Sequence, residues 1–429
     1  MNDPTLLSRD QLEAHQLEQL NHLLREIMPA NPFYAPRLKE AGLALPLRSL
    51  EEFTQAVPFT TKPELEANQQ AHPPYGHNLT YPLDRYTRYH QTSGTSGKPL
   101  RWLDTRESWQ WMVNNWKVVM QEARVHPGDH VFFAFSFGPF LGFWTAFEAA
   151  EQLGCLCISG GGMSSAARLS TMMANRTNVL CCTPTYALRL AEIAQSEGIA
   201  LEEIGVETIL VAGEPGGSVP ATRNRIKERW PGVRIFDHHG MTEVGPVSFE
   251  SYAHPGILHI IETAYLAEII DPVTGEPAPH NQAGELVLTP LGRAASPLLR
   301  YRTNDFVQPS FAGQEQYGRN EMALVGGILC RVDDMVIIRG VNVYPSAVDA
   351  IMRQFDEVVE YRVEIYEAHS LAEMKVLCEL HPECQNAAEA IQRIQTAFSQ
   401  EYNLRVPIEA AAPQSLPRFD MKAKRWIRM

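Results

Sequence analysis

The chain has 429 residues, 45% of them hydrophobic, and a formal net charge of −13. This length allows two or three globular domains, and the acidic balance argues against nucleic acid or an anionic membrane surface as a partner. The most apolar stretch, 131–144, contains two glycines and a proline and is too short to span a bilayer as one helix.

The seven cysteines are an odd number and lack the spacing of a zinc site. Four of them lie in apolar, strand-like runs, where buried reduced thiols are favoured over disulfides. The N-terminal segment is polar and mixed in charge, unlike an export signal. We therefore expect a cytoplasmic protein that has neither a membrane nor a nucleic acid as partner.

The first 90 residues predict helices followed by loops that are rich in proline and tyrosine. A stripe of apolar residues at helical spacing marks the first helix; it consists of Leu12, Leu20, Leu23, Leu24 and Ile27.

Residues 91–99 read QTSGTSGKP and predict a phosphate-binding loop. Hydroxyls and glycine amides in a tight loop can surround several phosphate oxygens, and Lys98 adds a positive charge. The spacing differs from that of the common nucleotide-binding loop, because only two residues separate Gly94 from Gly97 and a proline follows the lysine. The residues expected to contact phosphate are Thr92, Ser93, Gly94, Thr95, Ser96, Gly97 and Lys98.

From residue 131 onward, strand-like runs alternate with helical patterns. Strands are expected at 131–135, 155–159, 179–182, 208–212 and 234–236, and helices at 166–175, 186–198 and 219–229. This alternation predicts a mainly parallel sheet with helices on both faces. Since such sheets bind ligands at the carboxyl ends of their strands, the segments VAGEP (211–215) and FDHHGMTE (236–243) are expected to line one crevice.

After residue 256 the pattern changes to short strands joined by turns. It indicates a small antiparallel β subdomain over about 256–305. Further along, Ser346 is expected to cap a helix that is followed by two strands and another helix. We therefore predict an α/β protein with a large N-terminal domain, in which helices flank mainly parallel sheets, and a C-terminal α+β domain that starts around residue 334.

The QTSGTSGKP run resembles the pyrophosphate-binding loop of the acyl-adenylating, AMP-forming superfamily, which includes acyl-CoA synthetases, adenylation domains and luciferases. Four later segments resemble the remaining core motifs of that superfamily and occur in its order: HGMTEVG (239–245), YRTND (301–305), RVDDM (331–335) and RGVNV (339–343). PFTTK (58–62) and RGVNVYPSAVD (339–349) narrow the resemblance to the phenylacetate–coenzyme A ligase-like branch. The resemblance covers nearly the whole chain, and it implies a large N-terminal adenylation domain (1–332) and a mobile C-terminal α+β lid domain (333–429).

The resemblance implies a ligase that works in two steps. A small aryl carboxylate attacks the α-phosphate of ATP, giving an acyl-adenylate and pyrophosphate, and the thiol of coenzyme A then displaces AMP. Mg²⁺ is expected to bridge the phosphates. One alternative keeps the adenylation step and passes the acyl group to an amine or a carrier-protein thiol; another is a non-catalytic binding protein on the same fold. Relatives also suggest a homodimer.

Three residues carry the implied chemistry. Glu243 matches the family's metal ligand and is expected to bind Mg²⁺, and Thr242 beside it is expected to contact the α-phosphate. Lys422 matches the lysine that touches both the carboxylate and the α-phosphate. Met421 replaces the glycine that usually precedes this lysine, and Lys424 competes for the role.

Other residues are expected to hold the nucleotide and coenzyme A. Asp305 matches the aspartate that receives the ribose hydroxyls, and Asn304 replaces the glycine usual before it. Arg331 is expected near the ribose, Asp333 at the hinge of the lid, and Arg339 with Gly340 beside the coenzyme A channel. The remaining nucleotide contacts are expected from Gly213, Glu214, Pro215, Asp237, His238, His239, Gly240 and Met241.

The acyl pocket is expected to include the segment AFSFGPFLGFW (134–144). Phe135 and Phe140 fall where phenylacetate ligases place aromatic pocket walls, and Phe137 and Trp144 are further candidates. Aromatic residues on a strand belong equally often to the core, so both interpretations stay open. The other pocket residues expected are Ala212, Gly213, His239 and Gly240.

A structural metal is not expected. Some relatives carry a cysteine and histidine metal cluster in their central region. Ser251 and Tyr317 stand about where two of its cysteines would be expected.

Overall fold

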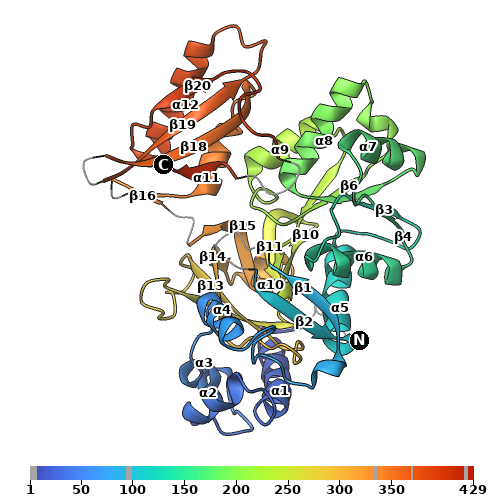
Figure 1. Cartoon of the computed structure of the whole chain (residues 1–429), viewed down its shortest axis with the longest axis vertical. Helices are drawn as coiled ribbons and strands as arrows, with labels where there is room; N and C mark the ends of the chain where they lie inside the picture. The colour runs from blue at the N-terminus through green and yellow to red at the C-terminus, as the bar shows by residue number, and fades with distance from the viewer. Residues whose placement is uncertain (1–6, 93–98, 333–335, 340, 369–370, 420–423) are drawn as a thin grey trace.

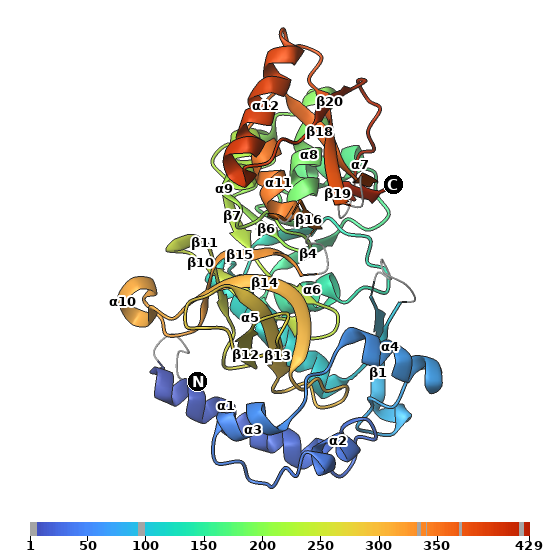
Figure 2. The same ribbon diagram turned by 90° about the vertical axis from the view of Figure 1, so that its left-hand side faces the viewer.

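The computed structural model describes residues 7–92, 99–332, 336–339, 341–368, 371–419 and 424–429. Figure 1 shows the N-terminal helices at one end of the molecule, an antiparallel sheet above them, and a sheet flanked by helices beside the C-terminal part. Figure 2 shows from the side that the C-terminal part lies at the end opposite to α1.

The N-terminal helices form a layer with its own apolar contacts. They are α1 (Arg9–Ile27), α2 (Tyr34–Glu40), α3 (Leu50–Ala56) and α4 (Lys62–Ala71). Ser8 and Gln11 cap the start of α1 reciprocally, each side chain accepting from the other's backbone N–H. The predicted stripe on α1 is buried, and most of it packs with Tyr34, Phe53 and Leu299.

A parallel sheet forms the centre of the helical half and confirms the predicted α/β class. Its order is β4 (Leu156–Ser159), β3 (His130–Phe133), β5 (Val179–Cys182), β6 (Thr208–Val211) and β7 (Arg234–Asp237), and every neighbouring pair is parallel. The connecting helices are α6 (Gly142–Leu153), α7 (Ser165–Ala174), α8 (Pro184–Glu197) and α9 (Pro220–Arg229), with a 3-10 turn at Leu201–Glu203.

The two faces of this sheet bury different side chains. On β5, Val179 and Cys181 join the core around α5 (Arg106–Glu122), whereas Leu180 and Cys182 join the core under α7 and α8. Every residue of β5 and β6 is buried. Burial on both faces is what a parallel sheet covered by helices requires.

A hairpin flanks the predicted phosphate loop. It consists of β1 (Tyr86–Gln91), which follows a 3-10 turn at Leu83–Arg85, and β2 (Arg101–Thr105). Residues 93–98 lie outside the described residues, but Thr92 and Leu100 on either side exchange hydrogen bonds of 2.9 and 3.0 Å. The two ends of the loop are thereby held together, and β2 leads directly into α5.

The antiparallel sheet is longer than the predicted 256–305. Its order is β10 (Ser248–Ser251), β11 (His254–Ile260), β15 (Ala323–Arg331), β14 (Tyr301–Ser310), β13 (Gly284–Pro290) and β12 (Tyr265–Ile270). After α10 (Gly313–Tyr317), β15 returns to lie between β11 and β14. Sequence reasoning missed β15, because Gly326 and Gly327 with φ of +78° and +67° interrupt its alternation.

The C-terminal part has a hydrophobic core of its own, built from residues between Val336 and Ile408. Its elements are β16 (Val336–Ile338), β17 (Val341–Val343), α11 (Pro345–Met352), β18 (Val358–Ala368), β19 (Leu371–Leu380), α12 (Ala387–Tyr402), β20 (Ile408–Ala411) and β21 (Trp426–Arg428). The prediction that Ser346 caps α11 is wrong. Tyr344 occupies the N-cap position, because Pro345, with its fixed φ, starts the helix two residues earlier than predicted.

The C-terminal part docks on α9 of the N-terminal part. Arg225 of α9 donates to the carbonyls of Phe355 (3.3 Å) and Val358 (2.8 Å). Thr222 Oγ1 lies 3.5 Å from Asp349 Oδ2 on α11. These polar contacts fix one orientation of the C-terminal part.

Candidate active site

The carboxyl ends of β6 and β7 bring the two predicted nucleotide segments together. Val211 and Asp237 are register partners at the ends of these strands. The backbone N–H of His238 donates to the carbonyl of Val211 (3.1 Å). The segments 212–215 and 237–243 therefore lie along one edge of the sheet, as the sequence predicts. In the first of them, Glu214 accepts a hydrogen bond from the backbone of Thr185 (2.8 Å).

Asp237 presents a buried carboxylate at this edge. Ser218 Oγ donates to its Oδ2 (2.6 Å), and the N–H of His238 donates to its Oδ1 (2.9 Å). Gly217 lies so close that a Cβ there would stand 2.1 Å from Oδ1, so only glycine fits. Burial raises the pKa of Asp237 to about 6, and the hydrogen bond from Ser218 opposes this rise. The Asp237 carboxyl is therefore largely ionised at neutral pH.

A buried ion pair holds the backbone around Asp237 in place. Arg223 and Glu250 form a bidentate pair with distances of 2.7 and 2.8 Å. Arg223 also donates to the carbonyls of Gly217 (2.6 Å) and Ile235 (2.8 Å), while the N–H of Asp237 donates to Glu250 (2.9 Å). Sequence reasoning missed this pair, because no motif contains either residue.

His238 is held as a neutral side chain. Burial lowers its pKa to about 3, so the Nδ1 atom, 2.6 Å from the carbonyl of Ser248, is the donor in that hydrogen bond. Its ring packs against Trp116 at 4.1 Å between centroids. His238 thus packs inside the strand end, and its predicted nucleotide contact stays a prediction.

Asp305 lies where three elements meet. Its Oδ2 is 2.9 Å from Nε2 of His239, and its Oδ1 is 3.5 Å from Nη1 of Arg331, its register partner on β15. Asn304 has a φ of +60°, a conformation that asparagine tolerates better than most residues. The structure therefore places together Asp305, His239 and Arg331, as the sequence predicts, and asparagine fits the glycine position before the aspartate.

Thr242 and Glu243 lie in the turn of a small hairpin. Its strands are β8 (Gly240–Met241) and β9 (Gly245–Pro246). The Glu243 side chain is buried, and its Oε1 lies 3.7 Å from Nζ of Lys62 at the start of α4. The sequence did not predict Lys62 as a site residue. Its place in the PFTTK motif, which narrows the resemblance, could have indicated it.

Tyr301 connects Glu243 with the Asp305 cluster. Burial raises the pKa of the Tyr301 hydroxyl well above its ordinary value, and the Glu243 carboxylate raises it further. Arg331 and Asp305 also act on this hydroxyl. The hydroxyl is therefore protonated at neutral pH, and the carboxylates of Glu243 and Asp305 both act on it.

The aromatic candidates for the acyl pocket divide into buried and exposed residues. Phe135 is buried in the main core, whereas Phe140 and Trp144 have exposed fractions of 38% and 36%. Phe137 has a φ of +50°, which is costly for a bulky residue, and makes edge-to-face contacts with Trp144 (5.1 Å) and Phe147 (5.6 Å). Phe137 and Trp144 thus form an aromatic wall, while Phe135 packs as a core residue.

Several predicted residues lie outside the described part of the chain, among them Lys422, Asp333, Gly340 and the loop residues 93–98. Lys424 is described and exposed. Arg339 pairs with Glu373 of β19 at 2.6 Å, a contact within the C-terminal part. Its predicted contact with coenzyme A stays a prediction.

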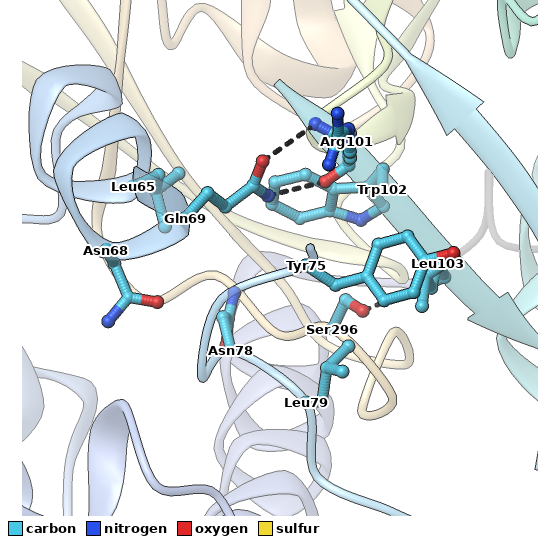
Figure 3. Close-up of a pocket in the computed structure, with 10 residues that line it drawn as sticks. All are labelled: Leu65, Asn68, Gln69, Tyr75, Asn78, Leu79, Arg101, Trp102, Leu103 and Ser296. Atoms are coloured by element: carbon cyan, nitrogen blue, oxygen red, sulfur yellow. Dashed lines mark hydrogen bonds between the residues drawn. The ribbon is translucent and has the colours of Figure 1, made fainter. Parts of the chain in front are cut away.

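A small pocket lies apart from this site, between α4, the loop before β1 and β2 (Figure 3). Its volume of about 10 Å³ is about that of a single water molecule. The Gln69 side chain donates to the backbone carbonyl of Arg101 (2.6 Å) and accepts from its backbone N–H (3.0 Å), and Figure 3 shows both hydrogen bonds. The pocket is too small for an acid or a nucleotide, and none of the predicted site residues lines it.

Within the described residues, no helix combines the length and apolar character needed to cross a membrane.

Comparison with known proteins finds two matching family descriptions. The model of the AMP-binding enzyme family matches residues 82–291, and that of the AMP-binding enzyme C-terminal domain matches residues 340–428. A phenylacetate–coenzyme A ligase of Thermus thermophilus is 35% identical over 376 residues, covering 86% of this chain and 82% of that protein. The enzyme of the same name from Pseudomonas putida is 33% identical, with 90% and 86% covered.

The structure is also similar to 2-hydroxyisobutyryl-CoA ligase. The postadenylation state of that enzyme, in complex with 2-HIB-AMP, matches with a TM-score of 0.92 at 28% identity, covering 99% of this chain and 91% of that chain. Its thioesterification state, in complex with 2-HIB-AMP and CoA, matches with a TM-score of 0.74.

Proposed function

The chain belongs to the AMP-binding enzyme superfamily, in the phenylacetate–coenzyme A ligase branch, and we propose that it is an AMP-forming ligase that joins an aromatic carboxylic acid to coenzyme A. The observation that carries this proposal is that His239, which follows β7 at the carboxyl end of the parallel sheet, lies 2.9 Å from Asp305, with Glu243 four residues further along the same segment. Relatives named phenylacetate–coenzyme A ligase match most of the chain.

In the first step, the site has to bind ATP and bring an anionic carboxylate to its α-phosphate. We assign Asp305, with Arg331 beside it, to the ribose hydroxyls, because a carboxylate accepts two hydrogen bonds. We assign Asp237 to the edge of the adenine. Lys62 places a positive charge beside Glu243 and so lowers the repulsion between the reacting anions.

The residues around Glu243 fit a magnesium ion that is held mainly by the nucleotide. Mg²⁺ prefers oxygen ligands and usually takes one or two carboxylates together with substrate phosphates. Glu243 offers one buried carboxylate at the site. No cluster of three metal-binding side chains occurs in the part of the chain that is described, which is consistent with an ion that arrives with ATP. When bound, the ion neutralises phosphate charge.

The second step needs a different position of the C-terminal part. We propose that it rotates about Asp333, at the boundary between domains 1–332 and 333–429, and that Lys422 serves adenylation while Arg339 and Gly340 serve coenzyme A. In support, the described orientation matches the postadenylation state of a relative better than its thioesterification state.

The acid is proposed to be aromatic because Phe137, in the loop after β3, contacts Trp144 of α6 edge-to-face at 5.1 Å, and Phe140 lies between them in the sequence. A panel of benzoates, phenylacetates and anthranilates, with 2-hydroxyisobutyrate as the aliphatic comparison, tests this class by acid-dependent ATP–pyrophosphate exchange. Exchange with aliphatic acids only would overturn the assignment of an aromatic substrate, and no exchange with any acid would favour a binding protein.

The acceptor is tested in the same mixtures by AMP release. Coenzyme A is expected to stimulate release, and an amine or a carrier protein in its place is not. Stimulation by the amine or carrier alone would instead identify the alternative adenylating enzyme. The predicted homodimer stays a proposal, and light scattering of the purified protein tests it.

A further inference from the structure

Arg293 is fully buried and lies directly behind the proposed metal ligand. Among the described residues it is the largest side chain that is fully buried. Its Nε and Nη2 donate to the two carboxylate oxygens of Asp104 at 2.7 and 2.6 Å. Its Nη1 donates to the carbonyls of Thr242 (2.9 Å) and Glu243 (2.8 Å). One guanidinium thus joins β2 to the turn between β8 and β9.

The next carbonyl in the same turn is also held from the core. Tyr265 Oη donates to the carbonyl of Val244 at 2.8 Å, and Tyr265 is itself fully buried. Three consecutive carbonyls, from 242 to 244, therefore accept hydrogen bonds from two buried side chains. The strands β8 and β9 have only two residues each, so their pairing alone would not hold this backbone rigidly. The hydrogen bonds from Arg293 and Tyr265 supply the additional restraint.

Stability alone is a weak reason for such a pair. Removing two charges from water is costly, and well-packed apolar residues are often at least as stabilising as a buried ion pair. The geometry of Arg293 points to a positional role, because its donors are divided between a fixed anion and the turn that carries Thr242 and Glu243. Asp104 lies on β2, the strand that follows the predicted phosphate loop.

We propose that Arg293, anchored by Asp104, is a positioning residue for adenylation, which fixes the turn of Thr242 and Glu243 relative to β2. The proposal rests on the proposed function, since it assigns Thr242 and Glu243 to the nucleotide phosphates. Arginine suits this role better than lysine. Its planar fork donates in several fixed directions, whereas an ammonium is a single point charge.

The first test measures the turn itself, in protein without nucleotide or metal. Hydrogen exchange of segment 240–246 is compared between the native protein, Arg293→Lys and Arg293→Met. Loss of a charge-assisted hydrogen bond is expected to speed exchange there by about tenfold or more. Arg319→Lys is the matched control, because Arg319 is also buried and pairs with Glu122 at 2.7 Å, away from the turn.

The second test is a double-mutant cycle with Glu243→Gln, read out by ATP–pyrophosphate exchange and by the Mg²⁺ concentration for half-maximal rate. Arg293→Lys is expected to raise that Mg²⁺ concentration or lower the rate by about 10- to 100-fold, as changes behind metal ligands do. In the Glu243→Gln background the effect of Arg293→Lys should be much smaller, because both act on the same turn.

Unchanged exchange in segment 240–246, or effects of Arg293→Lys and Glu243→Gln that multiply in full, would overturn the positioning role. If Arg293→Met fails to fold, Arg293→Lys alone decides, since it keeps the charge. Failure of Glu243→Gln to alter adenylation would count against the proposed function instead, and the hydrogen-exchange result would still decide whether Arg293 fixes the turn.

Discussion

Arg225 is expected to control how the C-terminal part divides its time between orientations. The change Arg225→Ala removes the donations to Phe355 and Val358, which join α9 to the C-terminal part. Neither contact lies near Glu243 or Asp305 in the sequence or on the same element. The variant should therefore alter the docking of the C-terminal part while the nucleotide site keeps its residues.

The structure sets the size of the effect. The bond to Val358, at 2.8 Å, is a good charge-assisted hydrogen bond, whereas that to Phe355, at 3.3 Å, is long. Such bonds contribute about 1.5–3 kcal/mol. Burial and the neighbouring Arg353 lower the pKa of Arg225, so docking also costs its charged form some energy. A net contribution of about 1.5 kcal/mol from Arg225 changes the equilibrium constant for docking about tenfold.

The assay separates the two half-reactions. Arg225→Ala should slow ATP–pyrophosphate exchange by up to about tenfold, while the release of AMP from preformed acyl-adenylate by coenzyme A stays equal or becomes faster. Arg229→Ala is the matched control, because Arg229 lies on the same helix and bonds to Gln195 of the N-terminal part. Equal slowing of both half-reactions, or an effect of Arg229→Ala as large, would refute this reasoning.

Three further predictions concern charge, pH and substrate. Lys62→Met should lower the rate of pyrophosphate exchange about tenfold and Lys62→Arg much less, because the cation beside Glu243 is lost only in the first; equal rates would contradict this. Burial, followed by the charge of Arg319, lowers the pKa of His259 to about 3. His259 therefore takes up a proton on unfolding at pH values below about 6.5, and the free energy of unfolding should fall by about 2.3 kcal/mol between pH 6.5 and 4.5 because of this residue. His259→Phe should flatten that slope in urea titrations, and an unchanged slope would exclude His259 as its source. Phe137→Ala should raise the KM for aromatic acids more than that for 2-hydroxyisobutyrate, and an equal rise would remove Phe137 from the acyl pocket.

The sequence predicted the parts of the fold that repeat a simple pattern. The strands at 179–182 and 208–211 are short apolar runs between helices, and each was placed within a residue of its true end. The strand β15 was missed because its glycines hide the alternation, and Ser346 was misplaced because Pro345 fixes the start of the helix. Patterns within about ten residues therefore predicted individual elements, whereas pairings between distant segments could not be predicted.

The same limit applies to the site. His239, Asp305 and Arg331 each lie in a recognisable motif, and the structure brings them together. Arg293 lies in no motif, and its anchor Asp104 is 189 positions away. Nothing local marks such a residue, because its role depends on two distant segments that meet only in the folded chain.

The C-terminal part buries most of its apolar residues in a core of its own, built from residues between Val336 and Ile408, and contacts the ring of Phe306 on β14 through Tyr344. Little apolar surface therefore has to lose or regain its hydration when this part rotates. Turnover then does not require a partly unfolded intermediate. The arrangement also suits recombination: the C-terminal module of a related ligase could be transplanted here, and incompatibility would be concentrated in the polar contacts with α9 and the stack of Tyr344 on Phe306.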